Sequence, residues 1–236
     1  MKITKLDTPN KSSRNGYKPQ LIVNHVTEGG YAGAVSWLRN PRSQASAHFV
    51  VSRQGEITQL VDLKDMAWCN GTGTGAGEKY NVNRSTVPLV QQLKGNANWY
   101  SVSIEHEGYS YKDLKGGLTE PQYQATLWLH QYIQDEVKRI YGVTIPFDRD
   151  HVVGHFEIAP KEKPNCPGQN FPWARLMADL RKGSEGVKVR CNGEDFRVDG
   201  KIIGGKNYVA IRDLCEKLGY KVDWDNKNST VILCKR

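Results

Sequence analysis

A closely spaced histidine and cysteine suggest a metal site. His155 precedes Cys166 by eleven residues, and Pro-Gly follows Cys166 directly. Imidazole nitrogen and thiolate sulfur are both zinc ligands, and the proline-rich segment between them can hold them near each other. Two side chains are too few to hold a catalytic metal, so a third ligand must come from elsewhere in the chain.

The other histidines and one further cysteine are the candidates for this third ligand. They are His25, His48, Cys69, His106, His130 and His151. His25 ends an apolar segment, at a point where an active-site loop can begin. Together with His155 and Cys166 it would give two imidazoles and a thiolate, which leaves zinc a fourth position for water or substrate. The alternative is a closed structural site with Cys69 or His48 as the fourth ligand.

Three segments predict the strands that would position these side chains. Residues 20–26 (QLIVNHV) are apolar and β-branched, which is typical of a buried strand. Residues 47–61 form two β-rich runs joined at a Gln-Gly pair, which predicts a hairpin. Residues 101–107 alternate in character, so Glu105 lies on the strand face opposite His106.

Two segments of this region predict helices. Residues 30–41 indicate a short helix that ends at Asn-Pro. A longer helix begins after Thr119, which is followed by an early proline, and it ends at Gly142. Because strands and helices alternate, we expect an α/β fold in which helices flank a central mixed β-sheet. Residues 70–98 are rich in glycine and asparagine and predict a long loop that lines a cleft.

The chain divides into two domains by these criteria. Residues 1–180 form the larger domain, residues 181–186 (RKGSEG) a linker, and residues 187–236 a small domain with the order β-β-α-β-β. The five cysteines are loosely spaced, so the chain is no disulfide scaffold. A disulfide bond between Cys191 and Cys234 is the alternative if the protein is secreted.

The net charge and the absence of certain motifs limit the kinds of partner that we expect for this protein. A net charge of +8 suits an anionic partner or, more simply, a solubilising surface. No helix-turn-helix, zinc-finger or base-stacking motif is present, so we expect no nucleic-acid partner. No apolar run reaches eighteen residues, and we expect no membrane span. The first residues lack the apolar core of a signal peptide, which predicts a protein that stays cytoplasmic until it is released to act at the cell wall or outside the cell.

Four sequence blocks carry a family resemblance. They are LIVNHVTEGG, ASAHFVVSRQGEITQLVDLKDMAWCNG, YSVSIEHEGY and GHFEIAPKEKPNCPG. In this order they resemble the motifs of the zinc-dependent N-acetylmuramoyl-L-alanine amidases, which are related to peptidoglycan recognition proteins. The resemblance covers roughly residues 15–180 and is strongest to clostridial cell-wall or prophage amidases. It implies an α/β fold with zinc at the floor of a surface groove.

The resemblance also implies roles for particular residues. His25, His155 and Cys166 fall on the positions of the zinc ligands. Receptor-type relatives that lost activity lack this cysteine, so its presence favours an enzyme. Some relatives use a tyrosine before the histidine of the second block as acid/base group, but Ala47 stands there. Others use the glutamate of the third block, here Glu105, which can take a proton from the attacking water and pass it to the leaving amine.

Several positions depart from the family pattern or stay ambiguous. Glu107 lies on the same strand face as Glu105 and is its rival. Many relatives carry an oxyanion-stabilising lysine two residues before the last ligand; here Lys163 is one residue earlier, and it is either catalytic or simply solvated. Cys69 replaces a common histidine. His106 is expected in the core, and His48 is either structural or part of the groove. The side chains expected to bind substrate are Asn24, His48, Trp68 and Asn70.

Residues 187–236 carry a second resemblance. The pattern NG…V…G…YVAIRDLCEKLGYKVDWDNKNSTVIL resembles a small repeat at the N-terminus of copper amine oxidases and in clostridial surface proteins. It contains no histidine, so nothing indicates copper. The resemblance implies a module for wall targeting or for homodimer formation. Tyr208, Tyr220 and Trp224 could bind an anionic wall polymer, and the alternative is that they form the core of the module.

Taken together, these features predict a Zn²⁺-dependent peptidoglycan hydrolase that causes cell-wall lysis. The bond cleaved would be the amide between N-acetylmuramic acid and L-alanine of the stem peptide. Two alternatives stay open. One is a non-catalytic peptidoglycan receptor, and the other is a zinc peptidase of the stem peptide.

Overall fold

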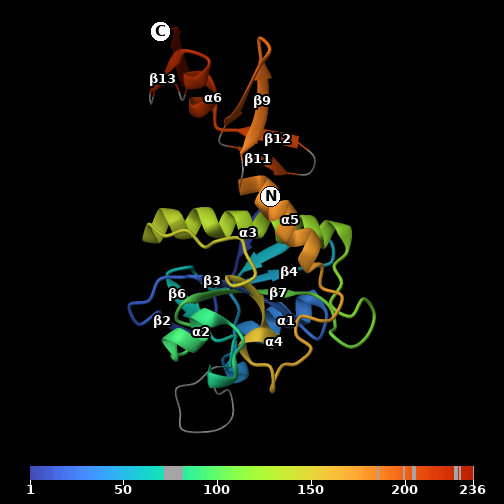
Figure 1. The fold of residues 1–236 in the computed structure, drawn as a ribbon. Coiled ribbons are helices and arrows are strands. Elements are labelled where there is room, and N and C mark those ends of the chain that lie inside the picture. Colours follow the sequence, from blue (N-terminus) through green and yellow to red (C-terminus); the bar gives the residue numbers. More distant parts are fainter. Residues whose placement is uncertain are drawn as a thin grey trace. The chain divides into compact units, whose positions relative to one another are not determined.

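A computed structural model describes residues 1–71, 82–184, 186–198, 200–203, 206–225, 228 and 230–235 (Figure 1). The chain consists of two compact units, Met1–Met177 and Ala178–Arg236. Each unit is described by itself.

A six-stranded sheet forms the centre of the first unit (Figure 1). In spatial order its strands are β1 Ile3–Lys5, β5 Ile57–Gln59, β4 Phe49–Val51, β7 Ser101–His106, β3 Leu21–Val26 and β8 Val152–Gly154. β3 pairs in parallel with β7 and β8, and β4 pairs in parallel with β7 but antiparallel with β5. The prediction of a mixed sheet is therefore confirmed.

Helices flank this sheet on both faces. The remaining elements of the unit are β2 Lys11–Ser13, β6 Asp65–Ala67, α1 Tyr31–Arg39, α2 Pro88–Leu93, α3 Glu120–Tyr141, α4 His155–Ile158 and the 3₁₀ turns Pro41–Ser43 and Val82–Arg84. α5 Trp173–Ser184 begins in this unit and ends in the second. On one face, Tyr132 of α3 packs edge-on against Phe49 of β4. On the other face, Val23 of β3 belongs to the same apolar cluster as Val90 of α2 and Ile158 of α4.

Local signals account for the elements that the sequence predicts. All six residues of β3 are buried, in keeping with its apolar, β-branched character. The Thr119 side chain accepts a hydrogen bond from the Gln122 backbone N–H and so caps α3. Gly142 ends this helix in the left-handed conformation, at φ +67°, which glycine adopts without steric cost. α1 ends where Asn40-Pro41 interrupts it.

Two segments differ from the prediction. The region 70–98, expected to be one long loop, contains α2 and a 3₁₀ turn; residues 72–81 lie outside the described part of the chain. Residues 181–184, expected in the linker, belong to α5. The helix continues because charged Arg181 and Lys182 lie in its last turn, where positive charge interacts favourably with the helix dipole.

In the described residues that follow α5, the second unit has four strands before the helix at residues 211–217, two more than the expected β-β-α-β-β order. Its elements are β9 Val187–Cys191, β10 Glu194–Val198, β11 Gly200–Ile203, β12 Lys206–Val209, α6 Ile211–Lys217, β13 Tyr220–Asp225 and β14 Thr230–Lys235. The β9–β10 hairpin turns at Asn192-Gly193, where both residues have positive φ, as a tight two-residue hairpin turn requires.

Side chains of the second unit correct one expectation. Tyr208 is 54% exposed and Trp224 is 48% exposed, so neither belongs to the core; Tyr220 is half-buried. A unit of this size has too little interior to bury every aromatic side chain. All five cysteines are free thiols, so no Cys191–Cys234 bridge is formed. Among the described helices of the chain, none combines the length and apolar character needed to cross a membrane.

Candidate active site

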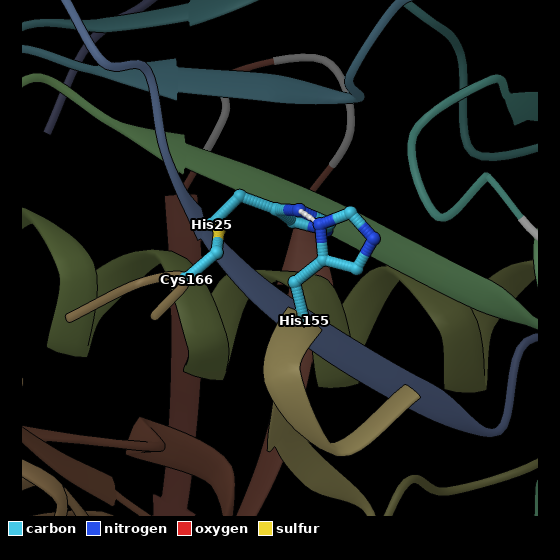
Figure 2. A group of neighbouring side chains, drawn as sticks. All are labelled: His25, His155 and Cys166. Atoms are coloured by element: carbon cyan, nitrogen blue, oxygen red, sulfur yellow. Dashed lines mark hydrogen bonds between the residues drawn. The ribbon is translucent and has the colours of Figure 1, made fainter. Parts of the chain in front are cut away.

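The structure brings together the three side chains predicted to bind a metal. Figure 2 shows His25, His155 and Cys166 converging from three segments of the chain. One donor atom from each lies within 4.8 Å of the other two. The two histidines face each other through their Nδ1 atoms, which are 3.0 Å apart.

Strand register explains why His25 and His155 meet. β3 and β8 are parallel neighbours, and Asn24 lies opposite Gly154. The residues that follow these two partners, His25 and His155, therefore lie at the same edge of the sheet, at the carboxyl ends of the two strands. His155 is at this point the first residue of α4.

The loop that follows α4 carries Cys166 back to β3. The Val26 backbone N–H donates a hydrogen bond to Cys166 Sγ (3.4 Å), and the Phe156 N–H donates to the Cys166 carbonyl (2.9 Å). Beyond Cys166, Gly168 and Gly116 touch backbone to backbone. A Cβ atom on either glycine would collide with the main chain beside the other, so this contact needs two residues without side chains.

Hydrogen bonding and burial make this group suitable for a cation. His155 Nε2–H donates to the Asn70 carbonyl (3.0 Å), which leaves the Nδ1 lone pair of the neutral ring directed at His25. Burial lowers the pKa of His155 to about 4 and holds the pKa of His25 well below its usual value. Both imidazoles are therefore neutral, as metal ligation requires, and a backbone carbonyl orients one of them from behind.

Burial has the opposite effect on the thiol. It raises the pKa of Cys166, so a nearby cation would be needed to displace the thiol proton. Two neutral imidazoles and one thiol are an appropriate donor set for a divalent transition metal. The residues present therefore fit a metal ion.

Glu105 lies beside this group. It is the register partner of His25 on the neighbouring strand β7. Burial raises the pKa of Glu105 to about 7, so its carboxyl group can both hold and release a proton near neutral pH. The Cys69 thiol is 3.8 Å from Oε1, while Oε2 has no hydrogen-bonding partner among the described residues.

A cavity of about 210 Å³ connects these groups. Its lining comprises His25, Val26, Glu28, Leu38, Ala45, Ser46, Trp68, Cys69, Glu105, His155, Lys163 and Cys166. Lys163 is exposed at the wall of this cavity. Trp68 is half-buried, and its indole N–H donates to Ser12 Oγ (3.0 Å), which fixes the ring. Both residues are placed where a substrate in the cavity would meet them.

Three of the predicted substrate-binding side chains do not reach the cavity. Asn24 is fully buried on the α3 face, where its amide contacts His130 Nε2 (3.3 Å), because successive strand residues point to opposite faces. His48 is also fully buried; its Nδ1 accepts from the Ser103 N–H (3.0 Å), and its Nε2–H donates to the Asp65 carbonyl (3.1 Å), with Arg14 2.8 Å from the same nitrogen. The structural alternative for His48 is therefore the correct one.

Asn70 takes part differently from the prediction. Its side-chain amide is buried and donates to Ser101 Oγ (2.8 Å), so the contact with the metal-binding group comes from its backbone carbonyl. Glu107, the rival of Glu105, accepts hydrogen bonds from the backbone N–H groups of Tyr31 and Arg53. This role at the start of α1 removes Glu107 from the chemistry.

Sequence reasoning missed two residues of the site. Glu28 lines the cavity and accepts hydrogen bonds from Ser110. Its position three residues after a strand-end histidine could have indicated this. Asn98 Oδ1 accepts from the backbone N–H groups of Cys69 and Asn70 and so holds this segment beside the residues that precede β7. No local pattern marks Asn98, because its partners lie almost thirty residues away.

Facing histidines, a thiol and a partly buried carboxyl group in one cavity are characteristic of a metallohydrolase. Residues 15–169 match the N-acetylmuramoyl-L-alanine amidase family, and the chain belongs to that family. Residues 188–236 match the copper amine oxidase N-terminal domain. The resemblances of both parts of the chain are thereby confirmed.

Individual relatives agree with this assignment. The chain is 27% identical to N-acetylmuramoyl-L-alanine amidase A of Achromobacter lyticus over 171 residues, which are 69% of this chain and 83% of that protein. It is 28% identical to 1,6-anhydro-N-acetylmuramyl-L-alanine amidase AmpD of Haemophilus influenzae over 138 residues. That match covers 58% of this chain but only 60% of the AmpD protein.

Solved structures show the same fold. A selenomethionine AmpD derivative superposes with a TM-score of 0.53 at 24% identity, covering 75% of this chain and 93% of that one. The endolysin LysCS from Clostridium intestinale superposes with a TM-score of 0.50 at 20% identity, covering 76% and 95%. The α/β fold with a central mixed sheet is thus common to this chain and to both structures.

Proposed function

We propose that this protein hydrolyses the amide bond between the lactyl group of N-acetylmuramic acid and L-alanine of the peptidoglycan stem peptide. Family membership supports the substrate, since curated relatives are named as amidases of this linkage. The observation that carries the proposal is the convergence of His25, His155 and Cys166 beside the partly buried carboxyl group of Glu105. A receptor would need no proton-transfer group with a pKa near neutrality.

The metal proposed for this site is zinc, held by His25, His155 and Cys166. When bound, zinc would polarise the scissile carbonyl and make water more acidic. The chain supplies the orientation of these ligands. The Asn70 carbonyl fixes the tautomer of His155, and the backbone of Val26 holds the Cys166 sulfur.

Glu105 is proposed to move the proton. Its carboxylate takes a proton from the attacking water as the water oxygen bonds to the carbonyl carbon. It then gives this proton to the alanine nitrogen as the C–N bond breaks. The products are a lactyl carboxylic acid on the glycan and a free amino group on the stem peptide. A pKa of about 7 suits both halves of this task.

Other side chains of the cavity are proposed to bind the substrate. The Lys163 ammonium group would stabilise negative charge that develops on the carbonyl oxygen. The fixed ring of Trp68 would provide an apolar wall. The carbonyl of Asn70 contributes indirectly, through His155.

We further propose that residues 1–180 form the catalytic domain, with 181–186 as connection and 187–236 as a wall-binding domain. The two family matches, to residues 15–169 and 188–236, support this division. Residues 181–236 contain 13 Lys and Arg against 8 Asp and Glu, a charge of +5, and expose Tyr208 and Trp224. Such a surface suits an anionic wall polymer. Homodimer formation is the second candidate role, and action at the cell wall follows from the substrate.

Digestion of purified peptidoglycan tests the proposed activity. New L-alanine amino termini, together with intact stem peptides and intact glycan in the mass spectrum, are the expected products. Walls that bind the protein but stay chemically unchanged would identify a receptor. Cleavage inside the stem peptide would identify a peptidase.

A further inference from the structure

A second set of metal donors overlaps the first. Single donor atoms of His25, Cys69 and Glu105 also lie within 4.8 Å of one another. His25 belongs to both sets, and both sets line the same cavity. Imidazole, thiolate and carboxylate are all zinc ligands, so the second set has the right chemistry as well as the right spacing.

Unpaired donor atoms accompany this second set. His25 is 1% exposed, and its Nε2 has no hydrogen-bonding partner among the described residues. The same holds for Oε2 of Glu105. The only polar contact within the set is the long one between Cys69 Sγ and Glu105 Oε1, at 3.8 Å. Buried polar atoms without partners require an explanation, and a bound ion is one that accounts for both atoms together.

We propose that His25, Cys69 and Glu105 form a second position for a zinc-class divalent cation, adjacent to the position formed by His25, His155 and Cys166. Because a neutral imidazole has one lone pair, His25 serves one position at a time, and a single ion alternates between them. Binding at the second position displaces the proton of the Cys69 thiol.

The second position has a functional consequence that rests on the proposed role of Glu105. With the ion at the first position, the carboxylate is free to move protons. With the ion at the second position, the same carboxylate is a ligand and is no longer a base. The second position is therefore a resting state, in which the chain keeps its metal but does not hydrolyse substrate.

Cobalt binding to the full chain tests the proposal without measuring activity. Co²⁺ replaces zinc, and a thiolate ligand gives it a charge-transfer absorption band. We compare C166A with the double variant C69A/C166A, which share every cysteine except Cys69. C166A should still bind Co²⁺ with a thiolate band. The double variant should lose the band, and its affinity for Co²⁺ should fall by about tenfold or more.

Two results would overturn the proposal. The first is that C166A binds Co²⁺ with no higher affinity than the double variant. The second is that C166A binds Co²⁺ but shows no thiolate charge-transfer band. Should C166A fail to fold, H155Q and H155Q/C69A make the same affinity comparison. The wild-type chain separates this question from the proposed function. If it binds metal but leaves peptidoglycan uncleaved, the proposed function fails while the second position can still stand.

Discussion

The two faces of the central sheet both bury histidines, yet only one face has the features of an active site. On the α3 face, His130 Nδ1–H donates to the Thr126 carbonyl (2.8 Å), and its Nε2 contacts the Asn24 amide. On the opposite face, His25 and His155 face each other and line a cavity. Burial alone therefore does not distinguish a site, whereas donors that converge on a cavity do.

Removing His25 should have the largest effect, because it belongs to both metal positions. The variant H25A should lose tightly bound zinc. Its rate of wall hydrolysis should be lower by at least about 10³-fold, since a bound metal stabilises the transition state by several kcal/mol. Metal content after dialysis and release of L-alanine amino termini measure the two effects. The matched variant H130A, on the other face, should keep its metal. Zinc retained in H25A at wild-type stoichiometry would contradict the ligand assignment.

Substitution of Glu105 separates proton transfer from metal binding. E105Q keeps the shape of the side chain but cannot take up a proton. It should retain zinc and lose about 10²- to 10⁴-fold in kcat, the usual contribution of a general acid/base group. E107Q is the control, because it alters a neighbouring carboxylate on the same strand. It should affect the stability of the fold and not proton transfer, because Glu107 accepts hydrogen bonds from backbone N–H groups. Near-normal hydrolysis by E105Q would remove Glu105 from the mechanism.

The histidines of the α3 face should make the fold sensitive to acid. Burial lowers the pKa of His130 to about 4 from the usual 6.5, so the unfolded chain binds this proton more readily. Stability should therefore be complete above pH 6.5 and should decrease as the pH falls toward 4, by about 3 kcal/mol for this one group. Urea unfolding at a series of pH values measures the slope. H130Q should flatten it, and an unchanged slope would show that His130 is not its source.

Lys163 should have the smallest effect, because its ammonium group is exposed to solvent. K163A should lower kcat/KM by about fivefold, equivalent to about 1 kcal/mol. K163R should restore most of this loss, since the positive charge returns. K161A, which removes an exposed lysine of the same loop that does not line the cavity, is the matched control. Equal losses in K161A and K163A would assign the effect to overall charge.

Much of the fold was predictable because its signals are local. The apolar run of β3, the Thr119 cap of α3 and the glycine that ends this helix each depend on a few adjacent residues. The Asn192-Gly193 turn of the second unit is equally local. The extent of α5 was harder to predict, since charged and small residues suit both a helix end and a linker.

The alternation of side chains along a strand was enough to predict part of the site. Adjacent residues of a strand point to opposite faces, so Asn24 and His25 could not both reach one cavity. By contrast, no local pattern distinguishes the buried structural His48 from a residue of the groove. That distinction required its partners Ser103 and Arg14, which are distant in sequence.

By itself, the sequence determined the strands, the helices and the identity of the residues able to bind a metal, because residue type and local spacing control these properties. Tertiary structure decided which of those residues meet. Parallel pairing of β3 with β8 and β7 places His25 beside His155 and Glu105, and the same packing brings Cys69 to Glu105. These contacts join segments up to 130 residues apart, and only the folded chain can bring such segments together.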